Sequence, residues 1–337
     1  MSKRQTICVA GASGFAGSHI VREALLRGYH VRGTLQSPGQ GQKTSALMRF
    51  PGAERRLRLF AAKAEEPGAF DQALEGCSAV FLTCFPPPRS GLDGTPTTRL
   101  DRRRGWEEII RPAEEGCLNI LTSASCQGLG TAVLCSSTAS AEPAEPSPQK
   151  QEYRDRSEAA LQIAQGKYQQ AQKTVMEEAA NRIAKKNGMR LVTLLPSMMI
   201  GPALMPHHLE GHVLKFLSGL LHGLPGWHDQ MPAGSMSLTH PQDLAQAALA
   251  ACEDPLAARR YFAHSGSWSW QEIYDRIAQH VPLSALPGPG ETGCIAAATR
   301  FDFTRRDRLQ TRFRNLEEII GGFYKWLNSD AGNFCQL

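Results

Sequence analysis

The stretch TICVAGASGFAG (residues 6–17) runs from an apolar segment into three closely spaced glycines. Its first half, Thr6 to Ala10, has the length and apolar character of a buried strand. The residues that follow, Ser18 to Arg27, place apolar side chains at helical spacing. A strand, a glycine turn and a helix therefore open the chain, and this order predicts the first unit of an α/β fold.

The glycines of this turn suit the binding of a dinucleotide. They let the turn tighten, bring backbone N–H groups close to a pyrophosphate, and let the helix pack on the strand. The helix N-terminus then faces the phosphates with the positive end of its dipole. The residues expected to form this site are Gly11, Ser13, Gly14, Phe15 and Gly17.

Apolar strands alternate with helical segments as far as Leu195. This alternation predicts a doubly wound parallel sheet of the Rossmann type, with helices on both faces. The expected strands are 29–35, 57–61, 79–83, 131–136 and 190–195, and the expected helices are 70–74, 106–125 and 168–186. Residues 1–200 would form the dinucleotide-binding domain. Residues 201–337, where Gly, Pro and His interrupt short helices, would form mainly a smaller substrate lobe, with some segments returning to the core.

Composition limits the kinds of partner. The formal net charge is only +5, and Lys and Arg are spread along the 337 residues rather than gathered in a stripe, which argues against nucleic-acid binding. The nine cysteines include no CxxC pair, which is typical of a reducing compartment, and no apolar run has the length of a membrane span. We therefore expect a cytoplasmic protein, monomeric or homodimeric, that binds neither nucleic acid nor membrane.

The end of the second strand, RGTLQSP (residues 32–38), carries no acidic residue. An Asp or Glu there would accept a hydrogen bond from the ribose 2′-hydroxyl of NAD and repel a 2′-phosphate. Ser37 and Lys43 lie nearby in the sequence and suit a phosphate group. The expected cofactor is therefore NADP, with NAD as the alternative.

Several further segments carry a family resemblance. They include GAFDQALEGCSAVFLTCFP (68–86), VLCSSTAS (133–140), KTVMEEAA (173–180) and LVTLLPSMMIGP (191–202). In their order and spacing, from about residue 5 to about residue 327, the chain resembles the plant dihydroflavonol reductase / cinnamoyl-CoA reductase branch of the extended short-chain dehydrogenases/reductases.

The resemblance implies a catalytic serine, tyrosine and lysine. Ser137 matches the serine that orients the carbonyl, and Lys173 matches the lysine that holds the nicotinamide ribose and lowers the tyrosine pKa. The family tyrosine, the acid, lies four residues before the lysine on the same helical face, but that position here is Gln169. Tyr168 lies five residues before Lys173. Either a one-residue bulge brings Tyr168 into the site, or Gln169 replaces the acid.

Two departures from the family concern the cofactor. Gln36 stands where the family usually has an Arg, and Lys63 where it has an Asp near the adenine, while Lys43 matches a lysine that assists the 2′-phosphate. Pro196 and Ser197 match the pair that borders the nicotinamide.

The second half offers less specific candidates. His207, His208 and His212 lie close together but lack the order of a zinc motif, so we expect a polar lip and no metal. An apolar substrate pocket could use soft side chains. The candidates are Met198, Met199, Met205, Phe216, Leu220, Trp227 and Met231.

Three functions are consistent with these features. The favoured one is an NADP-dependent reductase of a ketone or aldehyde on an apolar, including aromatic, small molecule. The second is a non-catalytic dinucleotide-binding protein with a structural or sensing role. The third is an isomerase or epimerase that uses tightly bound NAD.

Overall fold

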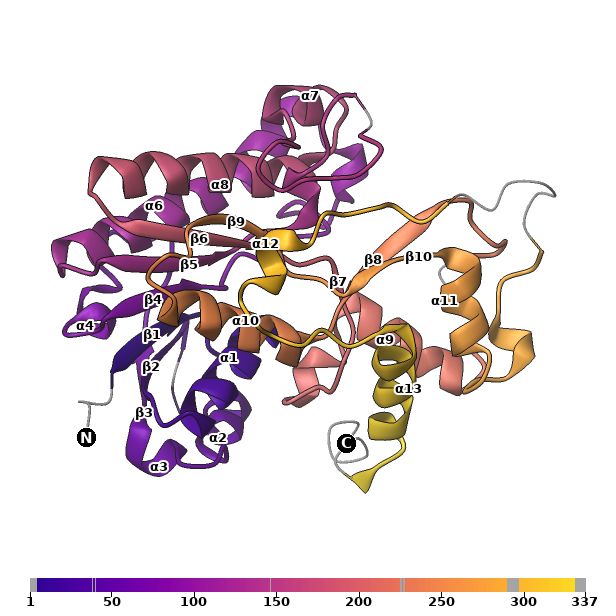
Figure 1. Cartoon of the computed structure of the whole chain (residues 1–337), viewed down its shortest axis with the longest axis horizontal. Coiled ribbons are helices and arrows are strands. Elements are labelled where there is room, and N and C mark those ends of the chain that lie inside the picture. The colour runs from indigo at the N-terminus through magenta and orange to yellow at the C-terminus, as the bar shows by residue number, and fades with distance from the viewer. Residues whose placement is uncertain are drawn as a thin grey trace.

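The structure is a computed structural model that describes residues 5–37, 39, 41–145, 147–224, 226, 228–289 and 297–330. A parallel sheet carries helices on both faces, and a smaller lobe lies beyond one end of its strands (Figure 1). The predicted α/β Rossmann fold with a smaller C-terminal lobe is therefore confirmed. Within these ranges, no helix combines the length and apolar character needed to span a bilayer.

The large sheet has the strand order β3-β2-β1-β4-β5-β6-β9, and every neighbouring pair runs parallel. Its strands are β1 (Thr6–Ala10), β2 (His30–Leu35), β3 (Leu57–Ala61), β4 (Ala79–Leu82), β5 (Thr131–Cys135), β6 (Arg190–Leu195) and β9 (Arg259–Phe262). The order reverses between β1 and β4. In open sheets of this kind the crevice at such a reversal, outside the carboxyl ends of the strands, is where ligands bind.

Alternation along β1 divides the core into two layers. Ile7 and Val9 belong to one buried cluster, whereas Cys8 and Ala10 belong to another on the opposite face of the sheet. The first cluster is covered by α1 and α10, which pack together, and the second by α6 and α8. The longer helices are α1 (Phe15–Leu26), α2 (Gln42–Met48), α6 (Arg111–Cys126), α7 (Ala159–Ala164), α8 (Tyr168–Lys186), α9 (His212–Leu221), α10 (Pro241–Glu253), α11 (Trp270–Ile277) and α13 (Leu316–Leu327). Short turns of helix are α3 (Ala53–Arg56), α4 (Asp71–Leu74), α5 (Arg102–Arg104), α12 (Thr304–Asp307), η1 (Thr97–Arg99), η3 (Thr138–Ser140), η4 (Pro206–His208) and η5 (Leu283–Ala285), and η2 (Gly105–Ile110) is a π-helix.

The smaller lobe contains a three-stranded sheet of order β10-β8-β7, formed by β7 (Met198–Met199), β8 (Ser235–Thr239) and β10 (Gly266–Ser269). Its core brings α9, α11 and α13 together around buried aromatic side chains such as Tyr274 and Phe323. Capping boxes at Ser269 and Asn315 begin α11 and α13.

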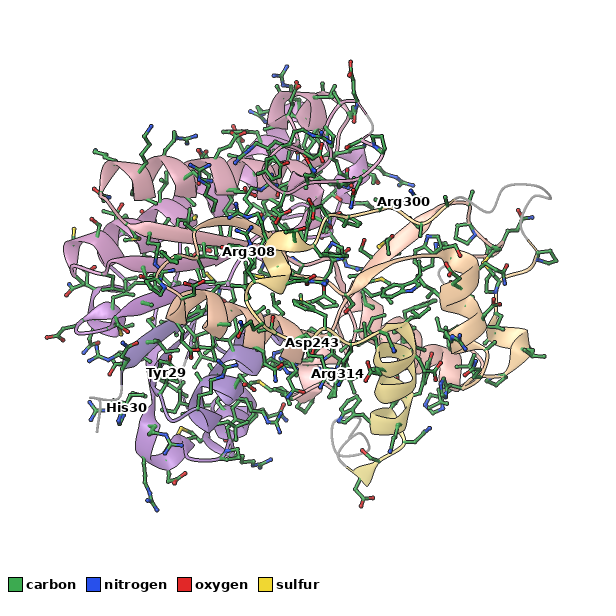
Figure 2. The ribbon with its side chains drawn as sticks, viewed as in Figure 1. Tyr29, His30, Asp243, Arg300, Arg308 and Arg314 are labelled. Carbon is green, nitrogen blue, oxygen red and sulfur yellow. The ribbon has the colours of Figure 1, made fainter. Side chains whose placement is uncertain are left out.

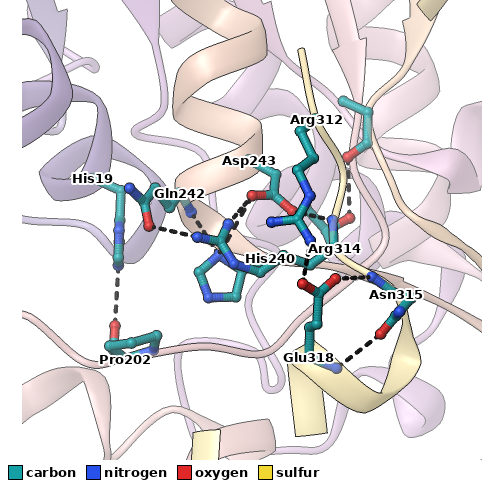
Figure 3. A network of polar contacts seen from close by, with 11 residues as sticks. His19, Pro202, His240, Gln242, Asp243, Arg312, Arg314, Asn315 and Glu318 are labelled. Atoms are coloured by element: carbon teal, nitrogen blue, oxygen red, sulfur yellow. Dashed lines mark hydrogen bonds and ion pairs between the residues drawn. The ribbon is translucent and has the colours of Figure 1, made fainter. Parts of the chain in front are cut away.

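A polar network ties this lobe to the helices of the large sheet. Arg314, just before α13, forms an ion pair with the buried Asp243 of α10 and donates to Gln242 Oε1 at 3.0 Å (Figures 2 and 3). The backbone N–H of Arg314 also donates to Asp243, at 2.7 Å. On α1, a ring nitrogen of His19 lies 3.0 Å from the Pro202 carbonyl oxygen, at the start of the lobe. The lobe is therefore attached at α1 and at α10.

The structure differs from the sequence predictions at several elements of the large sheet and its helices. The helix predicted from residue 106 is η2 followed by α6, and α1 begins at Phe15 rather than Ser18. The seventh strand, β9, was not predicted because it is only four residues long and begins with two arginines. Since α10 and β9 both return to the large sheet from the second half, the domain division at residue 200 stays a prediction.

Gly17→Ala is expected to lower the free energy of unfolding by about 1–3 kcal/mol, because overpacking forces the backbone apart. A Cβ at Gly17 would lie 2.7 Å from Thr83 Oγ1 and closer still to the Gly11 carbonyl oxygen. Gly322→Ala is the matched control, since a Cβ there meets nothing within 4 Å. It should raise stability by about 0.5–1 kcal/mol. Denaturant unfolding measures both, and equal stabilisation by the two alanines would contradict the packing argument.

Candidate functional site

A cavity of about 880 Å³ lies at the carboxyl ends of the parallel strands. Its lining brings together most of the site residues expected from the sequence, although they come from segments far apart in the chain. These are Gly11, Ser13, Gly14, Phe15, Gln36, Ser37, Lys43, Ser137, Lys173, Pro196 and Ser197. Gly17, Lys63 and Tyr168 are not among the lining residues.

The glycine turn forms one wall of this cavity. Gly11 has φ +83°, and a Cβ there would lie 2.8 Å from the Cβ of Cys84, so only glycine fits. The N–H of Gly14 donates to the Gly11 carbonyl at 3.0 Å, and α1 begins immediately afterwards without a side-chain cap. Because no side chain takes the first amides of α1, they are left for an anion in the cavity. The turn therefore fits a pyrophosphate, and Gly17 supports it from behind by letting α1 approach β1.

The segment that follows β2 contributes one basic residue and no acidic residue to the cavity lining. Gln36, Ser37 and Lys43 line the cavity, and Lys43 is on the first turn of α2. Lys63 does not lie with them, contrary to expectation. Its side chain is more than half exposed and its Nζ lies 3.1 Å from Glu66 Oε1. The neighbouring acid three residues on therefore holds Lys63 at the surface, outside the lining.

Ser137 lies in the turn after β5 and is the N-cap residue of η3. Its Oγ accepts the N–H of Ala139 at 3.2 Å, and the N–H of Thr138 donates to the Pro196 carbonyl at 2.9 Å. Since the hydroxyl oxygen of Ser137 is used as an acceptor in this turn, its own proton is left to be donated into the cavity.

Lys173 reaches the cavity from α8. Its side chain is only 7% exposed, and its Nζ donates to the Phe85 carbonyl at 2.6 Å. Burial lowers the pKa of Lys173 below its usual value. The ammonium group is thus held against the loop that follows β4, whose Phe85 and Pro86 also line the cavity.

Tyr168 lies elsewhere, so the expectation that a bulge brings it into the site is corrected. Helix α8 is a regular α-helix from its first residue, and the π-helical segment is η2, on the neighbouring helix. The Tyr168 ring is 4% exposed and packs against Gly105 of η2, where a Cβ would lie 2.5 Å from Tyr168 Cδ1. Its other apolar neighbours include Ile109 and Val175. Because Gly105 has no side chain, the Tyr168 ring fits against its backbone and forms part of the buried core.

Gln169 is left at the position of the family acid. Its Nε2 donates to the Pro88 carbonyl, on the loop whose prolines line the cavity. An amide has no ionisable proton, so Gln169 can hydrogen-bond a carbonyl oxygen but cannot act as an acid.

Some lining residues were not anticipated from the sequence. Gln172, one residue before Lys173, is buried, and its Oε1 has no hydrogen-bond partner in the described part of the chain. Glu108 is held by Arg104, whose Nε lies 2.6 Å from the carboxylate. Others on the lining are Thr34, Glu65, Thr83, Cys84 and Cys135. Among these residues, only Gln172 could have been found from the sequence, because it directly precedes Lys173.

The expected apolar pocket of the lobe is mostly core. Met205 and Leu220 are buried in separate clusters, whereas Met198 and Phe216 border a small apolar cavity apart from the large one. Of that set, Met199 alone lines the large cavity within the described residues. Trp227 and the His212 side chain lie outside what the structure describes.

His207 and His208 contact the glycine turn. Each donates an Nε2–H to the Ser13 carbonyl at 3.0 Å, and His208 Nδ1 accepts the Leu204 N–H. Burial lowers the pKa of His208 to about 4, so this ring is neutral at physiological pH. The described residues contain no group of three His, Cys, Asp or Glu that could hold a metal ion. The two imidazoles therefore join η4 to the turn.

Comparison with known proteins finds relatives that align with most of the chain. A family model described as NAD(P)H-binding matches residues 11–185. Tetraketide alpha-pyrone reductase 1 of Arabidopsis thaliana is 33% identical over 320 residues, covering 93% of this chain and 92% of that protein. Cinnamoyl-CoA reductase CAD2 of Medicago truncatula is 32% identical over 288 residues, covering 83% and 82%.

Solved structures share the fold at lower identity. Vestitone reductase from alfalfa (Medicago sativa) superimposes with a TM-score of 0.72 at 21% identity, over 96% of this chain and 98% of that one. Yeast methylglyoxal/isovaleraldehyde reductase Gre2, complexed with NADPH, gives a TM-score of 0.78 at 20% identity, over 99% and 100%.

Gly14→Val is expected to abolish NADPH binding while the protein stays folded. A Cβ at Gly14 would already lie 3.3 Å from the Gly11 carbonyl oxygen, and an isopropyl group would fill the space in front of the amides. Gly130→Val is the control, because Gly130 is exposed just before the amino end of β5, at the opposite edge of the sheet. NADPH fluorescence titration compares them. Equal affinity in a folded Gly14→Val protein would refute the placement of the pyrophosphate.

Proposed function

Since the chain belongs to the extended short-chain dehydrogenases/reductases, in the NAD(P)H-binding branch of dihydroflavonol and cinnamoyl-CoA reductases, we propose that it is an NADP-dependent carbonyl reductase. Its substrate is a ketone or aldehyde on an apolar, including aromatic, small molecule. The observation that carries the proposal is the presence of Ser137, Lys173 and the glycine turn on one cavity.

The residues present fit the dinucleotide. The cradle at Gly11 and Gly14 would be filled by any Cβ, and the first amides of α1 are free to bind the pyrophosphate. Ser37 and Lys43 would hold the 2′-phosphate, Lys173 the nicotinamide ribose, and Pro196 with Ser197 would border the nicotinamide. When bound, the reduced dinucleotide supplies a hydride to the carbonyl carbon of the substrate.

The chain's own residues then orient and protonate the substrate. Ser137 donates its free O–H to the substrate carbonyl oxygen and so fixes the orientation of that group. The positive charge of Lys173 stabilises negative charge developing on the oxygen. Since Tyr168 is packed away from the cavity and Gln169 is an amide that does not line it, the proton reaches the oxygen from a water molecule, which is reprotonated from solvent.

A non-catalytic dinucleotide-binding protein is the second candidate. The specific observation in its favour is the missing phenol, since the acid position holds Gln169. Lys173 would then serve only to bind the ribose. This candidate predicts tight binding of NADPH and no turnover of any carbonyl compound.

Gln169→Tyr separates these two functions. The variant restores the four-residue spacing to Lys173, and a general acid contributes about 10²–10⁴-fold to rate. If the chain is a reductase limited by its proton source, turnover of aromatic and aliphatic aldehydes and ketones with NADPH should rise by at least about tenfold. Tyr168→Phe is the control, expected to leave the rate unchanged because the ring lies in the cluster with Val175.

The outcome is measured as steady-state oxidation of NADPH. A loss of rate in Tyr168→Phe would contradict this placement and indicate that the tyrosine acts in the active site. A wild type that binds NADPH but turns over no carbonyl in a broad panel would establish the non-catalytic function.

Cofactor preference is tested with two lysines. NADPH should bind more tightly than NADH, and Lys43→Met should remove most of that preference, with tenfold in affinity corresponding to about 1.4 kcal/mol. Lys63→Met is the matched control, since Lys63 pairs with Glu66 at the surface and does not line the cavity. Calorimetric titration with both dinucleotides decides. An NADH preference in the wild type would overturn the NADP assignment and indicate that Gln36 hydrogen-bonds the 2′-hydroxyl instead.

We further propose that the protein acts in the cytoplasm as a monomer or homodimer. The cysteines in the described ranges are free thiols, which fits a reducing compartment.

A further inference from the structure

The turn that carries Ser137 is held from both sides by one carboxylate. Glu177 of α8 accepts the Ser140 Oγ–H at 2.7 Å, and Ser136 Oγ lies 3.3 Å from the same oxygen. These two serines flank Ser137, so the position of the Glu177 carboxylate determines where the turn lies. Glu177 is one helical turn beyond Lys173. The carboxylate thereby fixes Ser137 relative to the lysine.

Glu177 is in turn held by Arg260, from the unpredicted strand β9. Arg260 Nε lies 2.7 Å from Glu177 Oε1 in an ion pair without hydrogen-bond alignment, and its Nη2 donates to the Ser140 carbonyl at 2.7 Å. Its Nη1 donates to the carbonyls of Glu152 and Asp155, each at 2.9 Å. The guanidinium therefore bridges α8, the Ser137 turn and the loop that precedes α7.

Both charges of this pair are buried, because the side chains of Arg260 and Glu177 are 2% and 4% exposed. A buried ion pair contributes little net stability compared with an apolar pair, although loss of one partner is strongly destabilising. The planar fork of an arginine also fixes several acceptors at defined angles, which a lysine cannot do. The geometry therefore suits precise placement of the turn better than it suits stabilisation.

We propose that Arg260 is a positioning residue, which acts through Glu177 to hold the Ser137 hydroxyl in register with Lys173 for carbonyl reduction. This inference rests on the proposed function. Arg260 does not line the cavity, so its effect is on turnover and not on the dinucleotide.

Arg260→Lys and Arg260→Met test this role. Misplacement of a reacting group by about 1 Å can lower a rate about 10²-fold. We expect kcat to fall by about 10- to 100-fold in Arg260→Met and less in Arg260→Lys, which keeps the charge beside Glu177. The Kd for NADPH should change less than about twofold, because the glycine turn and Lys43 lie elsewhere.

Arg190→Lys is the matched control. Arg190 of β6 also donates to several backbone carbonyls, those of Ala251, Cys252, Asp254 and Ala257, but it lies at the amino end of the strand, away from the cavity. This variant should lower the melting temperature as Arg260→Lys does while leaving kcat unchanged. Equal kcat in the two lysine variants would reduce Arg260 to a structural role and overturn the proposal.

A second readout does not depend on turnover. Hydrogen exchange of the peptide containing Ala139, whose N–H is bonded to Ser137 Oγ, should speed up in Arg260→Lys with NADPH bound and not in Arg190→Lys. Unchanged exchange would overturn the positioning role. A wild type that reduces no carbonyl while this exchange difference is observed would defeat the proposed function but leave the control of the turn by Arg260 intact.

Discussion

The close approach of α1 to β1 at Gly17 is the constraint on which the rest of the crevice depends. With no Cβ at Gly17, the helix lies against the Gly11 carbonyl and beside Thr83 of the loop after β4. This contact aims the first amides of α1 into the crevice and leaves Gly11 in the left-handed region, against Cys84. The reversal of strand order between β1 and β4 then opens the crevice where those amides point.

Helix α8 organises the opposite wall by its periodicity. Gln169, Lys173 and Glu177 lie four residues apart on one face, and each contacts a different segment. Gln169 donates to the Pro88 carbonyl, Lys173 to the Phe85 carbonyl, and Glu177 accepts from the turn after β5. A single helix therefore sets the distance between the loop after β4 and the Ser137 turn. Tyr168 directly precedes Gln169 and therefore lies off this helical face, where it contacts η2 instead.

Features that depend on nearby residues could be predicted from the sequence, and features that depend on remote contacts could not. The turn at Gly11 and the strand before it follow from local sequence, whereas Lys173 was identified through the family resemblance. The location of Tyr168 depends on the missing side chain of Gly105, in a π-helical segment of another helix. In the same way β9 has little apolar character of its own, and the acceptors that Arg260 finds lie more than one hundred residues earlier. Lys63 was misplaced because the sequence does not show that Glu66 turns back toward it.

The contacts of His207 and His208 with the Ser13 carbonyl couple the attachment of the lobe to the binding of a ligand at the glycine turn. Ser13 belongs both to the turn that would receive the dinucleotide and to the attachment point of η4. Any ligand that orders this turn therefore also favours the attached state of the lobe, and by reciprocity an attached lobe raises the affinity of the turn. The resistance of the lobe to local unfolding and proteolysis should then follow the free dinucleotide concentration by mass action.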